Sequence, residues 1–488
     1  MRKQAIGALL LCLPGCMVGP DYATPETAVN EAWHEGDARI KRDIAQESEW
    51  WKTLNDPVLD GLITTARGQN LSLRTAGVRV LQSMAARGIS VGNLFPQVQE
   101  FNGDYTRSKA SESGPPVPTY SSSVGLGFDA AWELDFWGKF RRDIESADAL
   151  LDASLATYDD VMVTLIAEVA LAYIDIRTTQ ERIQIARDNV KRQEDGNRLA
   201  EERFNAGATS ELDPTQVKSL LAQTRAELPS LDAQLRQAMY RLTFLLGEPP
   251  RDLLDELGEA GKIPNAPAEV AVGIPADLLR RRPDIRLAER QAAAQSARIG
   301  VAKADLYPAF FLSGSLGLRA SDANNLFDSG SWTGSITPGF SWPVFNYGRI
   351  KNNIRVQDAE FEAAILNYRN TVLAAAQEVE SGLIGFLRGQ DRATHLEEAV
   401  KQSQKALDLA QVQYAEGTAD FQRVLDALAS LQVVQDSLVR TQGKIVVSLI
   451  ATHKALGGGW ELRDGTNIVP EETKEEMRAR TNWGKLLN

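Results

Sequence analysis

Apolar positions along the chain follow two different periods, and the same change of period occurs twice. Residues 123–136 alternate strictly, and their apolar members would face one way: Val124, Leu126, Phe128, Ala130, Trp132, Leu134 and Phe136. The same parity returns at residues 335–344, where the apolar side chains are Ile336, Phe340, Trp342 and Val344. A period of two predicts strands, whereas apolar residues three and four apart predict helices in the segments on either side.

The helical segments are unusually long. Residues 142–206 contain no proline and only one glycine, Gly196. At 1.5 Å per residue this predicts a helix of roughly 100 Å. Residues 349–416 predict a second helix of similar length, and shorter helices are expected at 212–246 and 421–456. Pro229 should kink the helix at 212–246. The first helix of the chain should begin at Pro57, with Asn55 or Asp56 as its cap, and run to about Val91.

Glycines at one constant spacing indicate an internal duplication. Gly138 and Gly348, Gly207 and Gly417, and Gly247 and Gly457 all lie 210 positions apart. Gly207 and Gly417 each follow a long helix and precede a short one, so they predict a tight turn between two helices. Ser210, Asp213 and Asp420 are candidates to cap the returning helices. The chain is therefore expected to be two copies of one unit.

The alternating segments fit two environments. They could form a soluble sandwich with the apolar face inward, or a membrane barrel with the apolar face toward lipid and the polar face toward a wet lumen. Strands at 97–107, 121–137, 309–319 and 333–346 have the length of a tilted membrane span. Four strands cannot close a barrel, so several chains would have to share one.

The helices also allow two interpretations. Two narrow apolar stripes run along the first long helix, made of Val161, Leu165, Val169 and Tyr173, and of Ile166, Ala170 and Ile174. Polar surface on both remaining sides suits a helix packed edge to edge in a hollow cylinder, whereas a solid bundle would show one broad apolar face. A long soluble coiled coil is the alternative, and the alternating strands argue against it.

The N-terminus predicts export. Arg2 and Lys3 precede an apolar run that ends at LPGC, as in a signal peptide with a lipobox. Cleavage before Cys16 would make this cysteine the acylated first residue of a lipoprotein. An ordinary signal peptide with a chance cysteine is the other interpretation, since Pro14 departs from the usual lipobox.

Charge and composition exclude several classes of function. The formal net charge of −12 makes a nucleic-acid partner unfavourable. The three histidines, His34, His395 and His453, lie far apart and lack metal-ligand spacing, so no metal, cofactor or enzyme active site is predicted. A structural coiled-coil scaffold remains as a rival, but it leaves the strands and the signal peptide unexplained.

Six motifs are distributed over nearly the whole chain after the signal peptide: CMVGPDYATP, SEWWKTLNDPVLDGLI, AWELDFWGKFRRDIESADA, LLRRRPDIRLAERQ, YAEGTADFQRVLDA and ALGGGW. Together they resemble the outer membrane factor family, the TolC-like exit ducts of Gram-negative tripartite pumps, and especially its lipoprotein drug-efflux branch. The resemblance implies a mixed membrane protein, in which a trimer forms a 12-stranded β-barrel that continues as an α-helical barrel with an equatorial mixed domain.

The resemblance also implies a function, partners and a location. The chain would be the outer-membrane exit duct of an efflux pump that passes drugs or other small molecules. A type I protein-secretion duct is the alternative. A periplasmic adaptor and an inner-membrane transporter of the resistance-nodulation-division type would be its partners. The chain would divide into a signal peptide (1–15), an anchored segment (16–55), two repeats (56–247 and 276–457), a linker (248–275) and a tail (458–488).

Finally, the resemblance assigns site residues. Those implied at the periplasmic gate are Asp426, Arg423, Tyr414 and Asp213. Those implied to contact the adaptor at the turns are Gly207, Ala208, Thr209, Gly417, Thr418 and Ala419. Some members of the family carry a second aspartate at the position of Arg423 and an arginine at the position of Ala419, so this chain departs from them at both positions. On the strands, the expected lipid-facing residues are Val124, Leu126, Phe128, Trp132 and Trp342.

Overall fold

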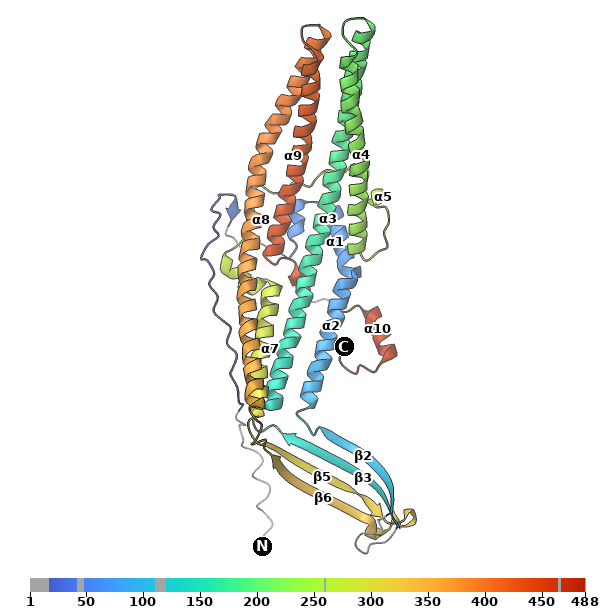
Figure 1. Cartoon of the computed structure of the whole chain (residues 1–488), viewed down its shortest axis with the longest axis vertical. Helices are drawn as coiled ribbons and strands as arrows, with labels where there is room; N and C mark the ends of the chain where they lie inside the picture. Colours follow the sequence, from blue (N-terminus) through green and yellow to red (C-terminus); the bar gives the residue numbers. More distant parts are fainter. Residues whose placement is uncertain (1–16, 42–47, 110–119, 259, 464–466, 488) are drawn as a thin grey trace.

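The computed structural model describes residues 17–41, 48–109, 120–258, 260–463 and 467–487. Long helices stand side by side, their hairpin ends at one extreme of the molecule, and four strands extend from the opposite end (Figure 1). The helices are α1 (Pro57–Gln69), α2 (Leu71–Gly92), α3 (Lys139–Asn205), α4 (Leu212–Leu245), α5 (Leu254–Leu257), α6 (Leu278–Arg281), α7 (Pro283–Ala304), α8 (Arg349–Ala415), α9 (Phe421–Ala455) and α10 (Glu471–Arg480). The strands are β1 (Ile40–Lys41), β2 (Val98–Lys109), β3 (Tyr120–Leu134), β4 (Val270–Ala271), β5 (Ala309–Ala320) and β6 (Trp332–Ser341).

The two halves repeat one plan. The long helices α3 and α8 each contain 67 residues, and α4 and α9 return antiparallel to them with 34 and 35 residues. All six glycines of the three spaced pairs have a φ between 74° and 83°. Because only glycine adopts this left-handed conformation readily, the spacing of 210 marks the same backbone reversals in both copies.

The four long strands form one antiparallel sheet in the order β2-β3-β5-β6. Their register pairs Phe101 with Phe128, Phe128 with Leu316, and Leu318 with Trp332. Paired residues share a face, so the apolar parity of β3 extends across the whole sheet. The strands expected from the alternation are present, although β3 ends at Leu134 and β6 at Ser341.

The main core lies where the helices of both repeats meet. Helix α3 packs against α1, α2, α4, α7 and α9, and α8 packs against α7 and α9. Trp50 is 2% exposed, and its ring stacks on that of His453 at a centroid distance of 5.2 Å. Trp51 is 3% exposed, so both tryptophans pack into the core.

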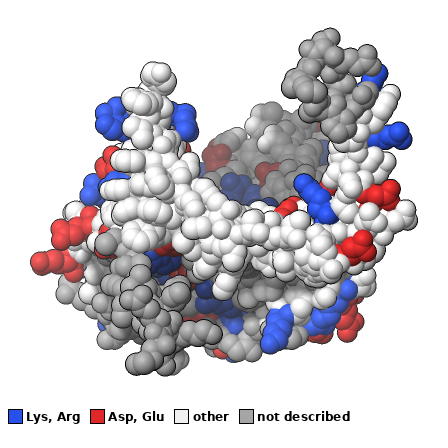
Figure 2. All heavy atoms as spheres, turned by 90° about the horizontal axis from the view of Figure 1, so that it is seen from below, with Lys and Arg blue, Asp and Glu red and all other residues white. Residues whose placement is uncertain are grey.

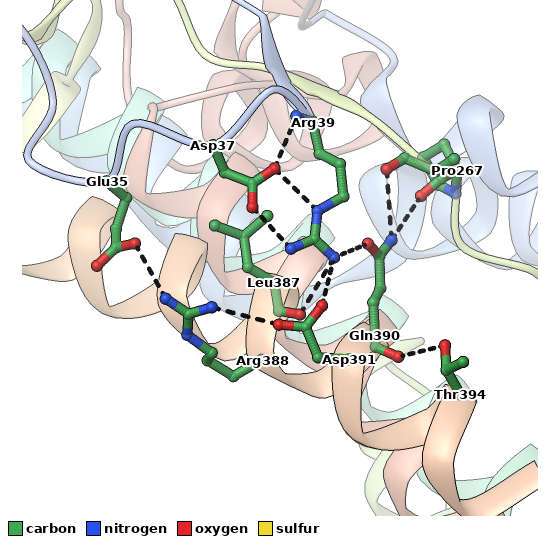
Figure 3. A network of polar contacts seen from close by, with 10 residues as sticks. Glu35, Asp37, Arg39, Pro267, Leu387, Arg388, Gln390, Asp391 and Thr394 are labelled. Atoms are coloured by element: carbon green, nitrogen blue, oxygen red, sulfur yellow. Dashed lines mark hydrogen bonds and ion pairs between the residues drawn. The ribbon is translucent and has the colours of Figure 1, made fainter.

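The N-terminal segment, residues 17–41, runs along α8 and is fixed there by a polar network (Figure 3). Arg39 lies at its centre, with ion pairs of 2.7 Å to Asp37 and 2.9 Å to Asp391. A hydrogen bond from its guanidinium to Gln390 adds a third partner. Just beyond it, β1 pairs in parallel with β4 of the linker. We call the linker, together with the residues of β1 that pair with it beside the middle of the long helices (Figure 1), the belt.

Two local expectations were wrong. The first helix is broken at Asn70, whose side chain accepts a hydrogen bond from the Leu73 amide and caps α2. Asp420 precedes α9, but its side chain makes no capping hydrogen bond. Pro229 lies within α4, which continues to Leu245, so the kink expected there stays a prediction. Capping by Asp56, by contrast, is confirmed, since its carboxylate accepts from the amides of Val58 and Leu59.

Charged and uncharged residues are distributed unevenly over the surface at the end that carries the sheet. Seen from the end that carries the sheet, a band of uncharged residues crosses the molecule, and lysine, arginine, aspartate and glutamate gather on either side (Figure 2). None of the helices in the described ranges has both the length and the apolar character that a membrane-spanning helix needs.

Candidate functional site at the helical tip and on the sheet

Both helical hairpins turn in the same way at the same end of the molecule (Figure 1). The Gly207 amide donates to the Phe204 carbonyl and the Ala208 amide to the Arg203 carbonyl, each at 2.9 Å. Gly417 and Thr418 repeat this pattern. Such paired bonds around a left-handed glycine close a helix and leave the turn exposed. The six residues expected at the turns lie here, with Thr209 and Ala419 half-buried and the others exposed.

Below the turns, a polar cluster joins the two hairpins. The Tyr414 hydroxyl on α8 donates to Asp213 Oδ2 on α4 at 3.0 Å, and the Thr209 hydroxyl contacts the same oxygen. Tyr414 is 2% exposed, and burial together with the Asp213 carboxylate raises its pKa to about 12. The hydroxyl therefore stays protonated at neutral pH and remains a hydrogen-bond donor.

Arg203 completes this cluster and was not identified from the sequence. Its guanidinium lies over the Tyr414 ring, 4.6 Å from the centroid, and donates to the Tyr414 carbonyl. A cation over an aromatic face is attracted to the ring quadrupole. The available signal was a basic residue in the last turn of a helix, one turn before Gly207. We call Arg203, Thr209, Asp213 and Tyr414 the tip cluster.

An apolar layer supports the tip cluster from the body side. The Phe421 ring meets the Tyr414 ring edge-on at 5.0 Å, and Phe421 is 1% exposed. The layer draws on all four long helices of the two hairpins; its buried members include Ala200, Val217, Leu407, Val424 and Leu428. The Tyr414 ring is thus held in one position, with its hydroxyl directed at Asp213.

Asp426 and Arg423 lie outside the tip cluster. Both are exposed on α9, and Asp426 accepts a hydrogen bond of 2.7 Å from Gln422. Within the described part of the chain Arg423 forms no ion pair. The four gate residues implied by the resemblance therefore separate into two pairs. Buried Tyr414 and half-buried Asp213 join the hairpins, whereas Asp426 and Arg423 are exposed on one helix.

At the opposite end, the sheet has one apolar face. Val124, Leu126, Phe128 and Trp132 share it, and large side chains on neighbouring strands remain uncovered in the single chain, including Phe101 at 77% and Ile336 at 81% exposure. Trp342 follows the last residue of β6, and its indole donates to the Leu306 carbonyl at 3.0 Å, so its contact with lipid stays a prediction.

Aromatic rings collect where the strands join the helices. The Trp137 ring stacks on Tyr307 at 4.6 Å, and its indole donates to the Pro308 carbonyl at 2.8 Å. Rings with one apolar and one polar part are typical of a membrane–water interface. Cys16 lies outside the described residues, but Val18 follows it closely and donates to the Trp137 carbonyl at 3.1 Å.

Comparison with known proteins gives a consistent result. The family model described as outer membrane efflux protein matches residues 62–248 and 274–458. The pyoverdine export outer membrane protein OpmQ of Pseudomonas putida is 34% identical, over 94% of this chain and 98% of its own. Nodulation protein T of Rhizobium leguminosarum bv. trifolii is 32% identical, over 92% and 96%. Among solved structures, the outer-membrane channel OprN superposes with a TM-score of 0.85 at 34% identity, covering 91% of this chain and all of OprN.

Proposed function

Because the chain belongs to the outer membrane efflux protein family, we propose that its helical tip is the periplasmic gate of an exit duct for small organic molecules. The chain functions as a homotrimer in the outer membrane, with a β-barrel continued by an α-helical tunnel. It works with a periplasmic adaptor and an inner-membrane transporter of the resistance-nodulation-division type. The name of the OpmQ relative, a pyoverdine exporter, supports small molecules rather than proteins as the cargo.

The observation that carries the gate is the tip cluster. It joins α3 and α4 of one hairpin to α8 of the other through the contacts of Tyr414 with Asp213 and Arg203. Separating the hairpins requires these contacts to break, so the tip cluster would hold the duct in its closed state. The exposed turns at Gly207 and Gly417 are the surfaces that we assign to the adaptor.

Asp426 supplies the second part of the proposal. In the trimer, the exposed Asp426 carboxylates of the three chains would form a ring of negative charge that attracts cations. Arg423, one helical turn earlier, would neutralise part of this charge. We expect Asp426→Ala to reduce the preference of the duct for cations, and Arg423→Ala to raise the conductance of the closed duct. Planar-bilayer recordings measure both, and unchanged values in both variants would remove this pair from the gate.

Lipid anchoring through Cys16 rests on the position of the residues that follow it. The bond between Val18 and the Trp137 carbonyl places the start of the described chain at the membrane end of the molecule, where an acyl group could enter lipid. Mass spectrometry of the mature N-terminus tests this. An unmodified N-terminus at another residue would disprove it.

The function as a whole is tested in the host cell. Deleting the gene should raise the accumulation of a fluorescent efflux dye, and expression of the wild-type chain should restore export. A chain that lacks the two turns, residues 206–209 and 416–419, should reach the outer membrane but fail to restore export. Full restoration by this variant would show that the turns are not needed for contact with the pump.

A further inference from the structure

A groove whose charged side chains are mostly basic lies between α4 and α9, with further lining residues from α3 and α8. Its volume is about 540 Å³. The charged residues that line it come from four helices: Arg182, Glu227, Arg392, Asp436, Arg440 and Lys444. We call this the basic groove. It has the size of a site for a small organic molecule.

The carboxylates do not balance the cations in the basic groove. Asp436 is shared, with its Oδ1 2.7 Å from Arg182 Nε and its Oδ2 2.7 Å from Arg440 Nε. Within the described part of the chain, Arg392 and Lys444 have no ion-pair partner, and both are exposed. Four cations face two carboxylates, a net charge of +2, in a chain whose net charge is −12.

The linker identifies the outer face of the helices. Gln180 on α3 donates to the Gly258 carbonyl at 2.7 Å, and Gln390 on α8 donates to the Pro267 carbonyl at 3.3 Å. On α9, Gln442 lines a cavity together with linker residues Lys262 and Ile263. The linker therefore crosses α3, α9 and α8 on one face.

The basic groove opens on the opposite face. At 3.6 residues per turn, Arg440 and Lys444 lie about 160° around α9 from Gln442, and Arg392 lies about 160° around α8 from Gln390. The belt that contains the linker surrounds the tunnel, so the opposite face lines the lumen. This step rests on the proposed function, since only a tunnel has a lumen.

We propose that the basic groove binds small organic anions with two or more carboxylates as they pass through the duct. Guanidinium groups hold carboxylates with paired, charge-assisted hydrogen bonds, and Arg182 and Arg440 are already positioned by Asp436. The exposed Arg392 and Lys444 supply the charge that is not neutralised within the chain. Three copies of the groove around the axis form a cationic zone in the tunnel, at the level of the belt.

The test measures binding of benzene-1,3,5-tricarboxylate to the purified, detergent-solubilised trimer by isothermal titration calorimetry at low ionic strength. Low salt is needed because exposed charges are screened at higher concentrations. The double variant Arg392→Gln/Lys444→Gln should bind about tenfold more weakly, at about threefold for each charge removed. Glu227→Gln, which removes a carboxylate from the groove, should bind about threefold more tightly.

Arg187→Gln is the matched control. Arg187 is an exposed cation on the same helix as Arg182, but it lines a different cavity with Leu254 of the linker, so its loss should leave the affinity unchanged. Equal affinity of the wild-type chain and the double variant for the tricarboxylate would overturn the proposal. The proposal would also fail if a wild-type trimer that conducts in planar bilayers did not bind the tricarboxylate. A chain that forms no channel at all would instead contradict the proposed function.

Discussion

At the scale of single residues, Tyr414 is the point where the contacts of the tip converge. Its ring is held between Phe421 and the Arg203 guanidinium, and its hydroxyl donates to Asp213 across the two hairpins. The sequence resemblance pointed to Tyr414 and Asp213, because both occupy recognisable motif positions. Arg203 could not be found in this way, since only the fold shows that the end of α3 lies beside the end of α8.

Tyr414→Phe should weaken the closed tip. The substitution keeps the ring contacts but removes the hydrogen bond to Asp213, which is worth about 1 kcal/mol, or about a fivefold change in the ratio of closed to open ducts. Planar-bilayer recordings should show a higher conductance in the closed state. Tyr347→Phe is the control, because Tyr347 is fully exposed at the other end of α8. Equal conductance of both variants would argue against the tip cluster as a latch.

His453 should make the stability of the core depend on pH. It is 5% exposed against Trp50, and burial lowers its pKa from 6.5 to about 4. Between pH 6.5 and pH 4, the His453 imidazole therefore binds a proton in the unfolded chain but not in the folded one. The free energy of unfolding is highest above pH 6.5 and falls as the pH decreases toward 4. The total loss is about 3 kcal/mol.

Thermal unfolding at pH 7.5 and pH 5 measures this effect. His453→Leu should lose less stability between the two pH values than the wild-type chain does. His395→Leu removes an exposed histidine of α8 and should behave like the wild type. If His453→Leu keeps the full wild-type pH dependence, another group is responsible for it.

At the scale of secondary-structure elements, the hydrophobic periodicity predicted the strands and helices correctly, but it did not predict where a helix is broken. The strict alternation of residues 123–136 predicted β3 and the parity of its faces, because one buried face fixes the register of a strand. The break at Asn70 was missed, although Gly68 and Asn70 are residue types that often end and cap helices. The structure shows its cause, since the Asn70 side chain both caps α2 and donates to the Leu245 carbonyl at the end of α4.

The sheet provides a direct test of parity. Leu126 lies on the apolar face, where an arginine should cost about 2–4 kcal/mol near the middle of the membrane, so Leu126→Arg should reduce the amount of assembled trimer. Gly127→Ser should be tolerated, because an added Cβ would be 3.4 Å from its nearest neighbour, the Asn102 side chain. Heat-modifiable trimers on gels measure assembly. Similar yields from the two variants would show that the faces are assigned wrongly.

The N-terminal segment should depend on Arg39 for its position on α8. Its ion pairs are partly exposed and therefore weak, so Arg39→Ala should leave global unfolding nearly unchanged. Local release should appear as faster amide hydrogen exchange in residues 33–41. Lys52→Ala, which removes an exposed pair with Glu49, is the control. Unchanged exchange after Arg39→Ala would mean that the pairing of β1 with β4 is sufficient.

At the scale of the whole molecule, the single chain leaves its sheet open. Within the described residues β2 and β6 are the edge strands, and their order makes them antiparallel to each other. The β6 edge of one chain can therefore pair with the β2 edge of the next without breaking the antiparallel pattern. Closure by three chains gives twelve strands with no unpaired edge, which removes the backbone groups that lipid cannot satisfy.

Cross-linking between these edges tests the trimeric duct most directly. Each test variant carries two cysteines on the polar face of the sheet. One is on β2, at Asn102→Cys or Asp104→Cys, and the other is on β6, at Ser335→Cys or Thr337→Cys. The four double variants that result are oxidised in outer membranes. At least one pairing should give a ladder on non-reducing gels that ends at three chains. Cross-links in none of the pairings, or a ladder that continues beyond three chains, would contradict a closed barrel shared by three copies.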